Sequence, residues 1–389
     1  MLRPKREPNQ ILEDAYKKAQ FNFNKDKGES FLSNLSKEAK EWLKIIVENS
    51  EEQKAIVAVL VTSLTKKIET PKQDVRYHQD GMPKGYSGRT FDTKYVTPFL
   101  KSVFPHIAMK ESGWLTRSLE QPSPFTLDYQ GHIRNKQVKS AFLRILNDVE
   151  ENKADPEKYL VSLLILLISE NLKTELLLSQ KVAIPSEKEV AIERVVNCLE
   201  RHFFHKYRAP GASMLPSIAI YSIYKLIVEE IGRYKGKTLK PLRSHLSPDM
   251  REGAIGDVEV VDEQGCFEAV EIKYNKPITV NDIRDAYKKF QNTAIKRYYL
   301  LTTAKPFIKE DKEGEVEYLK QKIRQEHGCE IIINGIIDSI KYYLRLTQNP
   351  KEFLEEYTNI LRLEISRSAE IKREHLETWL YILQSISKS

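Results

Sequence analysis

The chain has 389 residues, of which 41% are hydrophobic and 30% are charged, and its formal net charge is +7. This length and composition are those of a soluble globular protein large enough for two domains with cores of normal size. The charge excess is modest. It mildly favours a polyanionic partner but does not by itself establish that the protein binds nucleic acid.

The sequence carries no sign of a membrane span or of a cysteine-based site. Its longest apolar runs, residues 55–64 and 160–168, are far shorter than the roughly 20 residues that span a membrane, and we expect both to be buried helices. The three cysteines form no CxxC pair, which indicates neither a zinc site nor a disulfide framework. These features predict a cytoplasmic protein with no membrane partner.

Residues 1–209 are expected to form a mostly helical region. Apolar residues recur at helical spacing over 36–67, and further helices are predicted over 136–150 and 155–172. Residues 71–135 differ, because they mix Pro, Gly, aromatic and basic side chains in a pattern typical of irregular structure.

From residue 210 onward, short strand-like runs alternate with helical ones, which is an α/β order. The fold class predicted for the chain is therefore α/β (mixed α+β), with an α/β domain over 210–345 and a helical C-terminal tail over 346–389. The expected elements of the domain are a helix at 214–232, strands at 255–262 and 266–274, a helix at 280–293, a strand at 297–303, a helix at 308–327 and a strand at 329–334.

The two strand-like runs at 255–262 and 266–274 carry the candidate chemistry. Side chains in a strand alternate between faces, so Glu271 and Lys273 share one face of the second run. If the runs form an antiparallel hairpin centred near Gln264, Asp257 lies opposite Glu271, with β-carbons about 5 Å apart. Two carboxylates so close repel each other unless a divalent cation lies between them, and oxygen ligands of this kind suit Mg²⁺.

This set of groups could hydrolyse a phosphodiester. A bound Mg²⁺ polarises the phosphoryl oxygen and lowers the pKa of a bound water. Lys273 could stabilise the negative charge of the transition state, or it could orient or deprotonate the attacking water, and the sequence leaves both roles open.

Asp257 followed by Glu271-Ile272-Lys273 resembles the D…(D/E)xK signature of the PD-(D/E)xK nuclease superfamily. Gly256 stands where the name of the superfamily has proline. The resemblance implies a restriction-endonuclease-like core of helix, hairpin, helix and strand. It also implies a further acidic metal ligand from the helix before the hairpin, for which Glu229 and Glu230 are the candidates and Glu230 is preferred.

The segments SGRTFDTKYVTPFLK and GAIGDVEVVDEQGCFEAVEIKY resemble type II restriction endonucleases encoded beside cytosine-5 DNA methyltransferases. That resemblance implies sequence-specific cleavage of both strands of DNA by a homodimer in a prokaryotic cytoplasm. It also implies a cognate DNA methyltransferase that acts on the same site, without a physical complex between the two proteins.

Basic residues close to aromatic ones in 71–135 suit phosphate contacts and base readout, so this region is the expected site of DNA recognition. An ordinary basic surface is an equal alternative for these residues. A position on the helix after the hairpin often faces DNA in the superfamily. The residues chosen as DNA contacts are Arg89, Lys94, Arg117, Arg251 and Lys288.

Three other interpretations remain open. The acidic hairpin face could be a solvated surface with cross-strand ion pairs and no catalytic role. The chain could be a less specific PD-(D/E)xK nuclease of DNA repair or of a mobile element. It could also be a DNA-binding module that keeps the nuclease fold without activity, although the intact set of two acids and a lysine argues against this.

Overall fold

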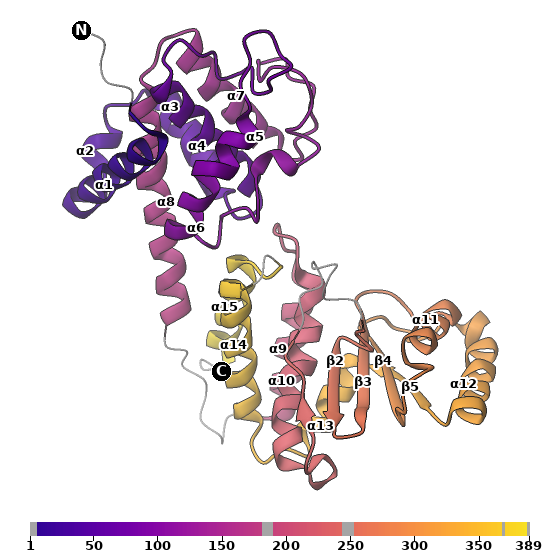
Figure 1. Cartoon of the computed structure of the whole chain (residues 1–389). Coiled ribbons are helices and arrows are strands. Elements are labelled where there is room, and N and C mark those ends of the chain that lie inside the picture. Colours follow the sequence, from indigo (N-terminus) through magenta and orange to yellow (C-terminus); the bar gives the residue numbers. More distant parts are fainter. Residues whose placement is uncertain (1–5, 181–189, 243–252, 368–369, 387–389) are drawn as a thin grey trace. The chain divides into compact units, whose positions relative to one another are not determined.

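The computed structural model describes residues 6–180, 190–242, 253–367 and 370–386, and it divides into two compact units (Figure 1). The N-terminal unit is Met1–Gln180 and the C-terminal unit is Lys181–Ser389. The first unit is helical and the second combines helices with a sheet, so the chain as a whole is a mixed α+β protein, as predicted.

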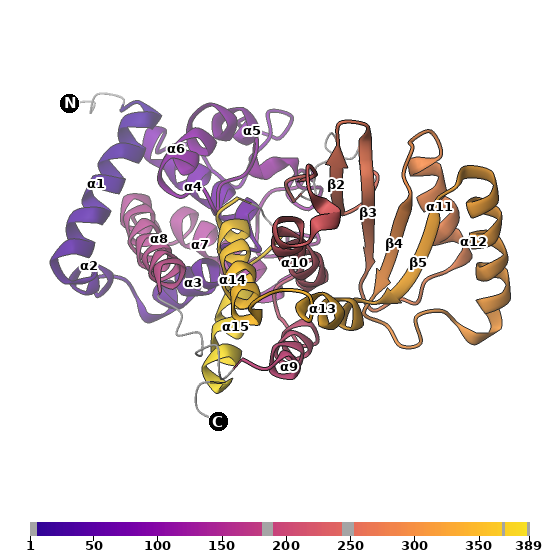
Figure 2. The ribbon, with the colours of Figure 1, turned by 90° about the horizontal axis from the view of Figure 1, so that it is seen from below.

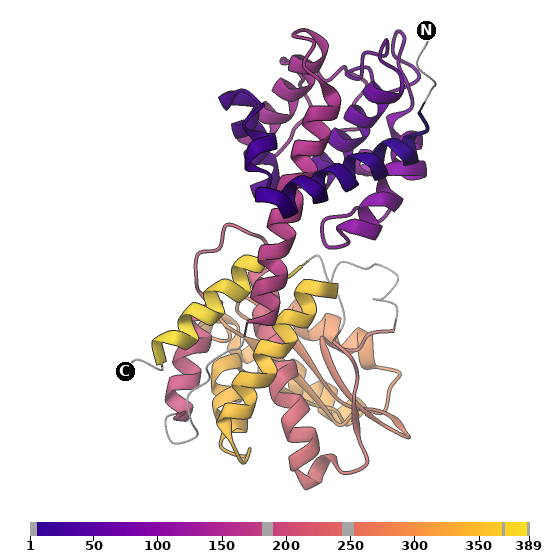
Figure 3. The same ribbon diagram turned by 90° about the vertical axis from the view of Figure 1, so that its left-hand side faces the viewer.

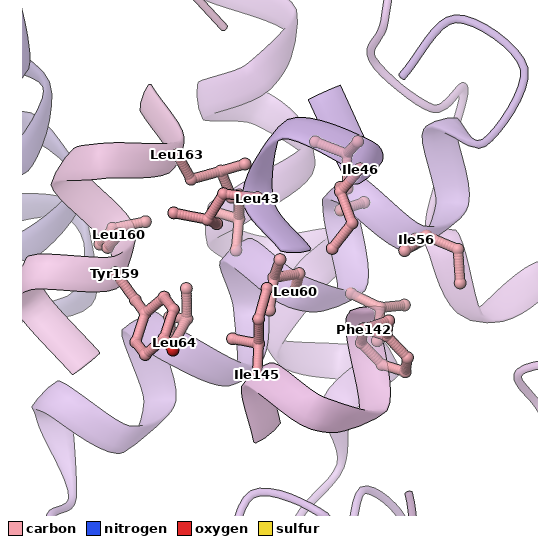
Figure 4. Packing of buried hydrophobic residues seen from close by; sticks show 14 of the residues in the cluster. Leu43, Ile46, Ile56, Leu60, Leu64, Phe142, Ile145, Tyr159, Leu160 and Leu163 are labelled. Carbon is pink, nitrogen blue, oxygen red and sulfur yellow. The ribbon is translucent and has the colours of Figure 1, made fainter. Parts of the chain in front are cut away.

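The N-terminal unit is built around α4, which is buried on all sides over residues 56–65. Leu60 and Leu64 of α4 pack against Phe142 and Ile145 of α7 and against Leu160 of α8 (Figure 4). Each large apolar side chain removed from water here contributes about 1.5–3 kcal/mol. The helices of the unit are α1 (Pro8–Asp26), α2 (Glu29–Leu32), α3 (Lys37–Glu48), α4 (Lys54–Glu69), α5 (Gly88–Phe91), α6 (Thr97–Val103), α7 (Lys136–Glu150) and α8 (Pro156–Ser179).

Local sequence signals set several of these helix ends. The Ser36 side chain accepts a hydrogen bond from the Ala39 amide at the start of α3, and the Asn135 side chain caps α7 in the same way. Pro156 occupies the first turn of α8, where its missing N–H costs nothing. Figure 3 shows α1, in indigo, crossing α8. The helices predicted over 36–67, 136–150 and 155–172 are confirmed, with the first divided into α3 and α4.

The segment 71–135 has short helices within irregular backbone, and its aromatic side chains lie inside the unit. Tyr86, Phe91 and Trp114 are each less than 9% exposed. A β-carbon on Gly88 would lie 2.5 Å from the Trp114 ring, so glycine allows the close approach of this loop to the ring. These three rings therefore form part of the core of the unit rather than part of its surface.

The C-terminal unit contains a five-stranded sheet among the described residues, in the order β1-β2-β3-β4-β5. The pairs β1–β2 and β2–β3 are antiparallel, whereas β3–β4 and β4–β5 are parallel. The elements of this unit are α9 (Ile192–Phe203), α10 (Leu215–Glu230), β1 (Thr238–Leu239), β2 (Val258–Asp262), β3 (Gly265–Lys273), α11 (Val280–Phe290), β4 (Arg297–Thr302), α12 (Glu313–His327), β5 (Glu330–Gly335), α13 (Ile336–Leu344), α14 (Pro350–Arg367) and α15 (Arg373–Ile386).

Helices cover both faces of this sheet (Figures 1 and 2). On one face, Ala269 of β3 and Leu300 of β4 pack against Ile283 and Phe290 of α11 and against α12. Helices α10 and α13 lie on the other face. The expected order of helix, two strands, helix, strand, helix and strand is confirmed, and the short β1 is an addition that the sequence pattern did not predict.

The β2–β3 hairpin contains an irregularity that sets its register. Asp262 pairs with Gly265 across a two-residue turn, but beyond a bulge at Val260/Val261 the partner of Val260 is Glu268. The extra residue, Phe267, therefore lies on β3. Gly265 has a φ of +122°, a conformation that side chains disfavour, as expected for a glycine at this turn.

The C-terminal helices belong to the same unit as the sheet. Helix α14 contacts α10, and α15 contacts α9, so the two cover the helices that precede the hairpin (Figure 3). The boundary between the units lies at 180/181, earlier than the 209/210 expected from the sequence, because α9 packs with α13, α14 and α15. Residues 346–389 are helical where they are described, but they form part of this unit.

Cys198, Cys266 and Cys329 are buried and form no disulfide bond in the structure. Burial raises the pKa of each thiol. Within the described parts of the chain, no helix is both long and apolar enough to pass through a bilayer.

One buried histidine makes the stability of the N-terminal unit depend on pH. His78 is 1% exposed, accepts a hydrogen bond from the Trp114 indole N–H at Nδ1 (2.9 Å), and is 3.1 Å from the Ser123 carbonyl oxygen at Nε2. Burial lowers the pKa of His78 from 6.5 to about 4. The unfolded chain therefore binds a proton that the folded chain excludes, so this contribution to stability is complete above pH 6.5 and is lost as the pH falls towards 4.

We predict that the unfolding free energy of the wild type falls by about 2 kcal/mol more than that of His78→Gln between pH 7.5 and pH 5. Urea denaturation of the full chain at the two pH values, followed by tryptophan fluorescence, measures the difference. Equal losses in the two proteins would show that His78 does not titrate between the folded and unfolded states.

Candidate functional site

Asp257 and Glu271 lie at the outer end of the β2–β3 hairpin. The ladder ends where Val258 pairs with Val270, and Asp257 and Glu271 are the next residues outward on the two chains. The Asp257 amide donates to the Val270 carbonyl (2.8 Å), and the Ile272 amide donates to Asp257 Oδ2 (2.8 Å). Both the backbone and the side chain of Asp257 are thus tied to β3.

A buried tyrosine lies beside Glu271 at this end of the hairpin. Tyr298 of β4 donates its hydroxyl proton to the Ile255 carbonyl (2.7 Å), and the same hydroxyl lies 3.4 Å from Glu271 Oε2. Burial raises the pKa of Tyr298 well above its ordinary value, and the negative charges of Glu271 and Asp257 raise it further. Both acids therefore act on this one hydroxyl from the sheet face covered by α11.

Glu271 is held by two ammonium groups. Lys273 Nζ lies 3.0 Å from its Oε1, and Lys289 Nζ, from α11, lies 2.7 Å from its Oε2. Burial alone would raise the pKa of Glu271, but the charges and hydrogen bonds of the two lysines outweigh it and hold the pKa below its usual range. The carboxylate is only 14% exposed, so Glu271 does not belong to a solvated hairpin face.

Lys273 lies between two carboxylates. Its ammonium contacts Glu271 and also lies 3.5 Å from Asp282 Oδ1 on α11. Burial would lower the pKa of Lys273, but these two acids raise it above its ordinary value. The group is therefore a cation at neutral pH, which favours charge stabilisation over proton abstraction as the role of Lys273.

The backbone before Asp257 is fixed by a second, buried carboxylate. Glu259 is 3% exposed, and its Oε1 accepts the amides of Ile255 (2.8 Å) and Gly256 (3.4 Å), while its Oε2 pairs with Lys240 (2.6 Å). A β-carbon on Gly256 would lie 2.8 Å from the Val270 carbonyl oxygen. A proline at 256 would lack the N–H that Glu259 accepts and would bring ring atoms against β3, so this position favours glycine over proline.

The donor chemistry of Asp257 and Glu271 fits Mg²⁺, which is usually held by one or two carboxylates together with water and substrate phosphate. Among the described residues, no group of three His, Cys, Asp or Glu side chains is gathered closely enough to hold a metal ion. Glu230, the weaker metal candidate, lies at the end of α10, where its Oε2 accepts the Gln348 amide (2.8 Å). The structure does not bring Glu230 into one cluster with the pair.

The residues chosen as DNA contacts lie at separate places. Arg89, Lys94 and Arg117 are exposed on the N-terminal unit, where Arg89 lies 3.3 Å from Glu120 and Lys94 lies over the Tyr95 ring. Lys288 of α11 is 72% exposed and pairs with Asp285. Arg251 lies outside the described residues.

The sequence analysis missed the roles of three residues at the site: Lys289, Asp282 and Tyr298. A helical signal could have found the first two, because Asp282, Ala286 and Lys289 are spaced i, i+4 and i+7 and so share one face of α11. Lys288, chosen instead, is turned away from that face. Tyr298 reaches the site through the parallel pairing of β3 and β4, and no local pattern predicts that contact.

Comparison with known proteins adds nothing to this geometry. A scan against models of protein families finds no match to the chain, and a search of curated proteins finds none either.

We predict that Gly256→Ala destabilises the C-terminal unit by about 1–3 kcal/mol, because its β-carbon would push the Asp257 backbone away from the main chain of β3. Gly314→Ala is the matched control. No atom lies within 4 Å of a β-carbon at this position in α12, and alanine favours the helix over glycine. Thermal unfolding of the two variants should show a loss for the first only, and equal melting temperatures would refute the proposed close approach.

Proposed function

We propose that this protein is a Mg²⁺-dependent DNA endonuclease of the type II restriction class, which makes sequence-specific double-strand breaks by phosphodiester hydrolysis. One observation carries the proposal. Asp257 directly precedes the last ladder pair of the hairpin and accepts the amide of Ile272, the residue between Glu271 and Lys273, and Lys273 pairs with Glu271.

The topology of the C-terminal unit supports a PD-(D/E)xK core. An antiparallel hairpin is followed by α11 and by two parallel strands, and α10 precedes the hairpin. The acids lie at the end of this hairpin, where the register, the bulge and the Glu259 contacts hold them in place.

In the proposed mechanism, Asp257 and Glu271 would hold the metal ion. When bound, the ion supplies a polarised phosphoryl oxygen and a water of lowered pKa. Lys273 provides a fixed positive charge where negative charge develops on the phosphoryl group, and Asp282 holds that ammonium in position. The Tyr298 hydroxyl, bound to the Ile255 carbonyl, limits the freedom of the Glu271 carboxylate.

The proposed partner is double-stranded DNA. Arg89, Lys94, Arg117, Arg251 and Lys288 remain proposed contacts to its backbone or bases. Cutting both strands needs two active sites, which a homodimer supplies, and its two-fold symmetry would match a palindromic site. A cognate DNA methyltransferase that modifies the same sequence belongs to this proposal, as does a prokaryotic cytoplasmic setting.

We predict that Asp257→Asn, Glu271→Gln and Lys273→Met each lower Mg²⁺-dependent cleavage at least about 10²-fold, because each removes a charge that acts on the metal or on the transition state. The assay incubates unmethylated phage DNA with the purified protein and Mg²⁺, and then sequences the fragment ends. Glu317→Gln is the control for lost charge, since Glu317 lies on α12 and pairs with Lys320.

The same assay separates the alternatives. Discrete ends that share a motif support a restriction enzyme, whereas a smear indicates a less specific nuclease of repair or of a mobile element. Binding of DNA by the wild type without Mg²⁺-dependent cleavage indicates an inactive DNA-binding module. Cleavage that survives the loss of both Asp257 and Glu271 would refute the proposed active site.

A further inference from the structure

Both oxygens of Glu271 are in contact with lysine. Lys273 Nζ is 3.0 Å from Oε1 and Lys289 Nζ is 2.7 Å from Oε2. A metal ion that binds Glu271 must bind at least one of these oxygens, where a neighbouring ammonium group would repel it. Metal binding is therefore stronger when one lysine moves away from Glu271.

The two lysines differ in how firmly they are held. Lys273 projects from the sheet, is 27% exposed, and has a second carboxylate partner in Asp282. Lys289 lies near the end of α11, is 38% exposed, and among the described residues reaches no carboxylate within 4 Å other than Glu271. A flexible, partly exposed side chain with one carboxylate partner separates from that partner more easily than a side chain held by two. Of the two lysines, Lys289 is therefore the one that can move away from Glu271.

We propose that Lys289 is a displaceable counter-ion of Glu271, which occupies the place of the metal until DNA arrives and then transfers its ammonium to a DNA phosphate. This inference rests on the proposed nuclease function and adds a positioning role for Lys289. The transfer moves one positive charge from a carboxylate to a phosphate, forms no covalent bond, and frees one Glu271 oxygen for the metal.

The exchange would make DNA binding and metal binding favour each other. A phosphate that attracts Lys289 lowers the cost of placing a cation on Glu271, and a cation on Glu271 repels Lys289 towards the phosphate. Linkage requires the two effects to be equal in free energy. The free protein would therefore bind metal weakly and would be loaded on its substrate.

The first test measures Mn²⁺ binding to the full chain without DNA, by electron paramagnetic resonance of the free ion. Lys289→Ala and Lys289→Gln should bind Mn²⁺ about 5- to 150-fold more tightly than the wild type, because the competing ammonium is gone. Lys289→Arg, which keeps the charge, should stay close to the wild type. Lys320→Ala is the matched control. It removes the same charge from α12, where the ammonium contacts Glu317 rather than Glu271, and it should change the affinity little.

The second test measures the coupling itself, with Ca²⁺ in place of Mn²⁺ because Ca²⁺ also binds through oxygen ligands. Calorimetric titration is carried out with and without sonicated duplex DNA. DNA should tighten Ca²⁺ binding to the wild type more than to Lys289→Gln. An equal effect of DNA on both proteins would contradict the transfer of Lys289 to phosphate.

The failure of this inference is distinct from the failure of the proposed function. If the wild type cuts DNA with Mg²⁺ and binds Mn²⁺, while Lys289→Ala and Lys289→Gln bind Mn²⁺ no more tightly than it does, the inference on Lys289 is wrong and the nuclease stands. If the wild type and every variant neither bind Mn²⁺ nor cut DNA, both proposals fall. Circular dichroism confirms that each variant is folded, and the Gln and Arg variants preserve the length of the side chain if the Ala variant is unstable.

Discussion

The candidate site depends on the pairing of β2 with β3 at the end of the hairpin that carries Asp257 and Glu271. Asp257 is held twice, by its own amide on the Val270 carbonyl and by the Ile272 amide on its carboxylate. Its position relative to Glu271 is therefore set by strand geometry rather than by a loop. If the pairing slipped by one residue, one of the two acids would turn to the other face of the sheet. The chemistry of the site therefore requires this register of the hairpin.

Counting along the sequence set Asp257 opposite Glu271 in a regular hairpin, but the hairpin of the structure is not regular. The two-residue turn pairs Asp262 with Gly265, and a regular ladder from there would pair Asp257 with Val270. The extra residue Phe267 shifts the register, so that Val258 is the residue paired with Val270. Period-two alternation could be read from the sequence, whereas a bulge is an irregularity that alternation cannot predict.

The contacts that hold the site from a distance were the least predictable. Glu259 is buried and fixes the two amides before Asp257, and no pattern in the sequence marked it for this role. In the N-terminal unit, a mixture of basic and aromatic residues suggested a DNA surface, but Trp114 and its neighbours form the core. The composition of a segment gives its residue types, but it does not tell which side chains become buried. Burial depends on packing partners that lie far away in the chain.

The charges around Glu271 explain why the site suits a substrate that is itself an anion. Among the described residues the site holds three carboxylates, on Asp257, Glu271 and Asp282, and two ammonium groups, on Lys273 and Lys289. This set is close to neutral, so a bare divalent cation would leave an excess of positive charge in a partly buried place. A phosphodiester group adds one negative charge, which offsets this excess. The net charge of these acids and lysines together with the metal ion is therefore closest to zero when the phosphate is bound. Under the proposed function, that balance favours hydrolysis of bound DNA over storage of metal by the free protein.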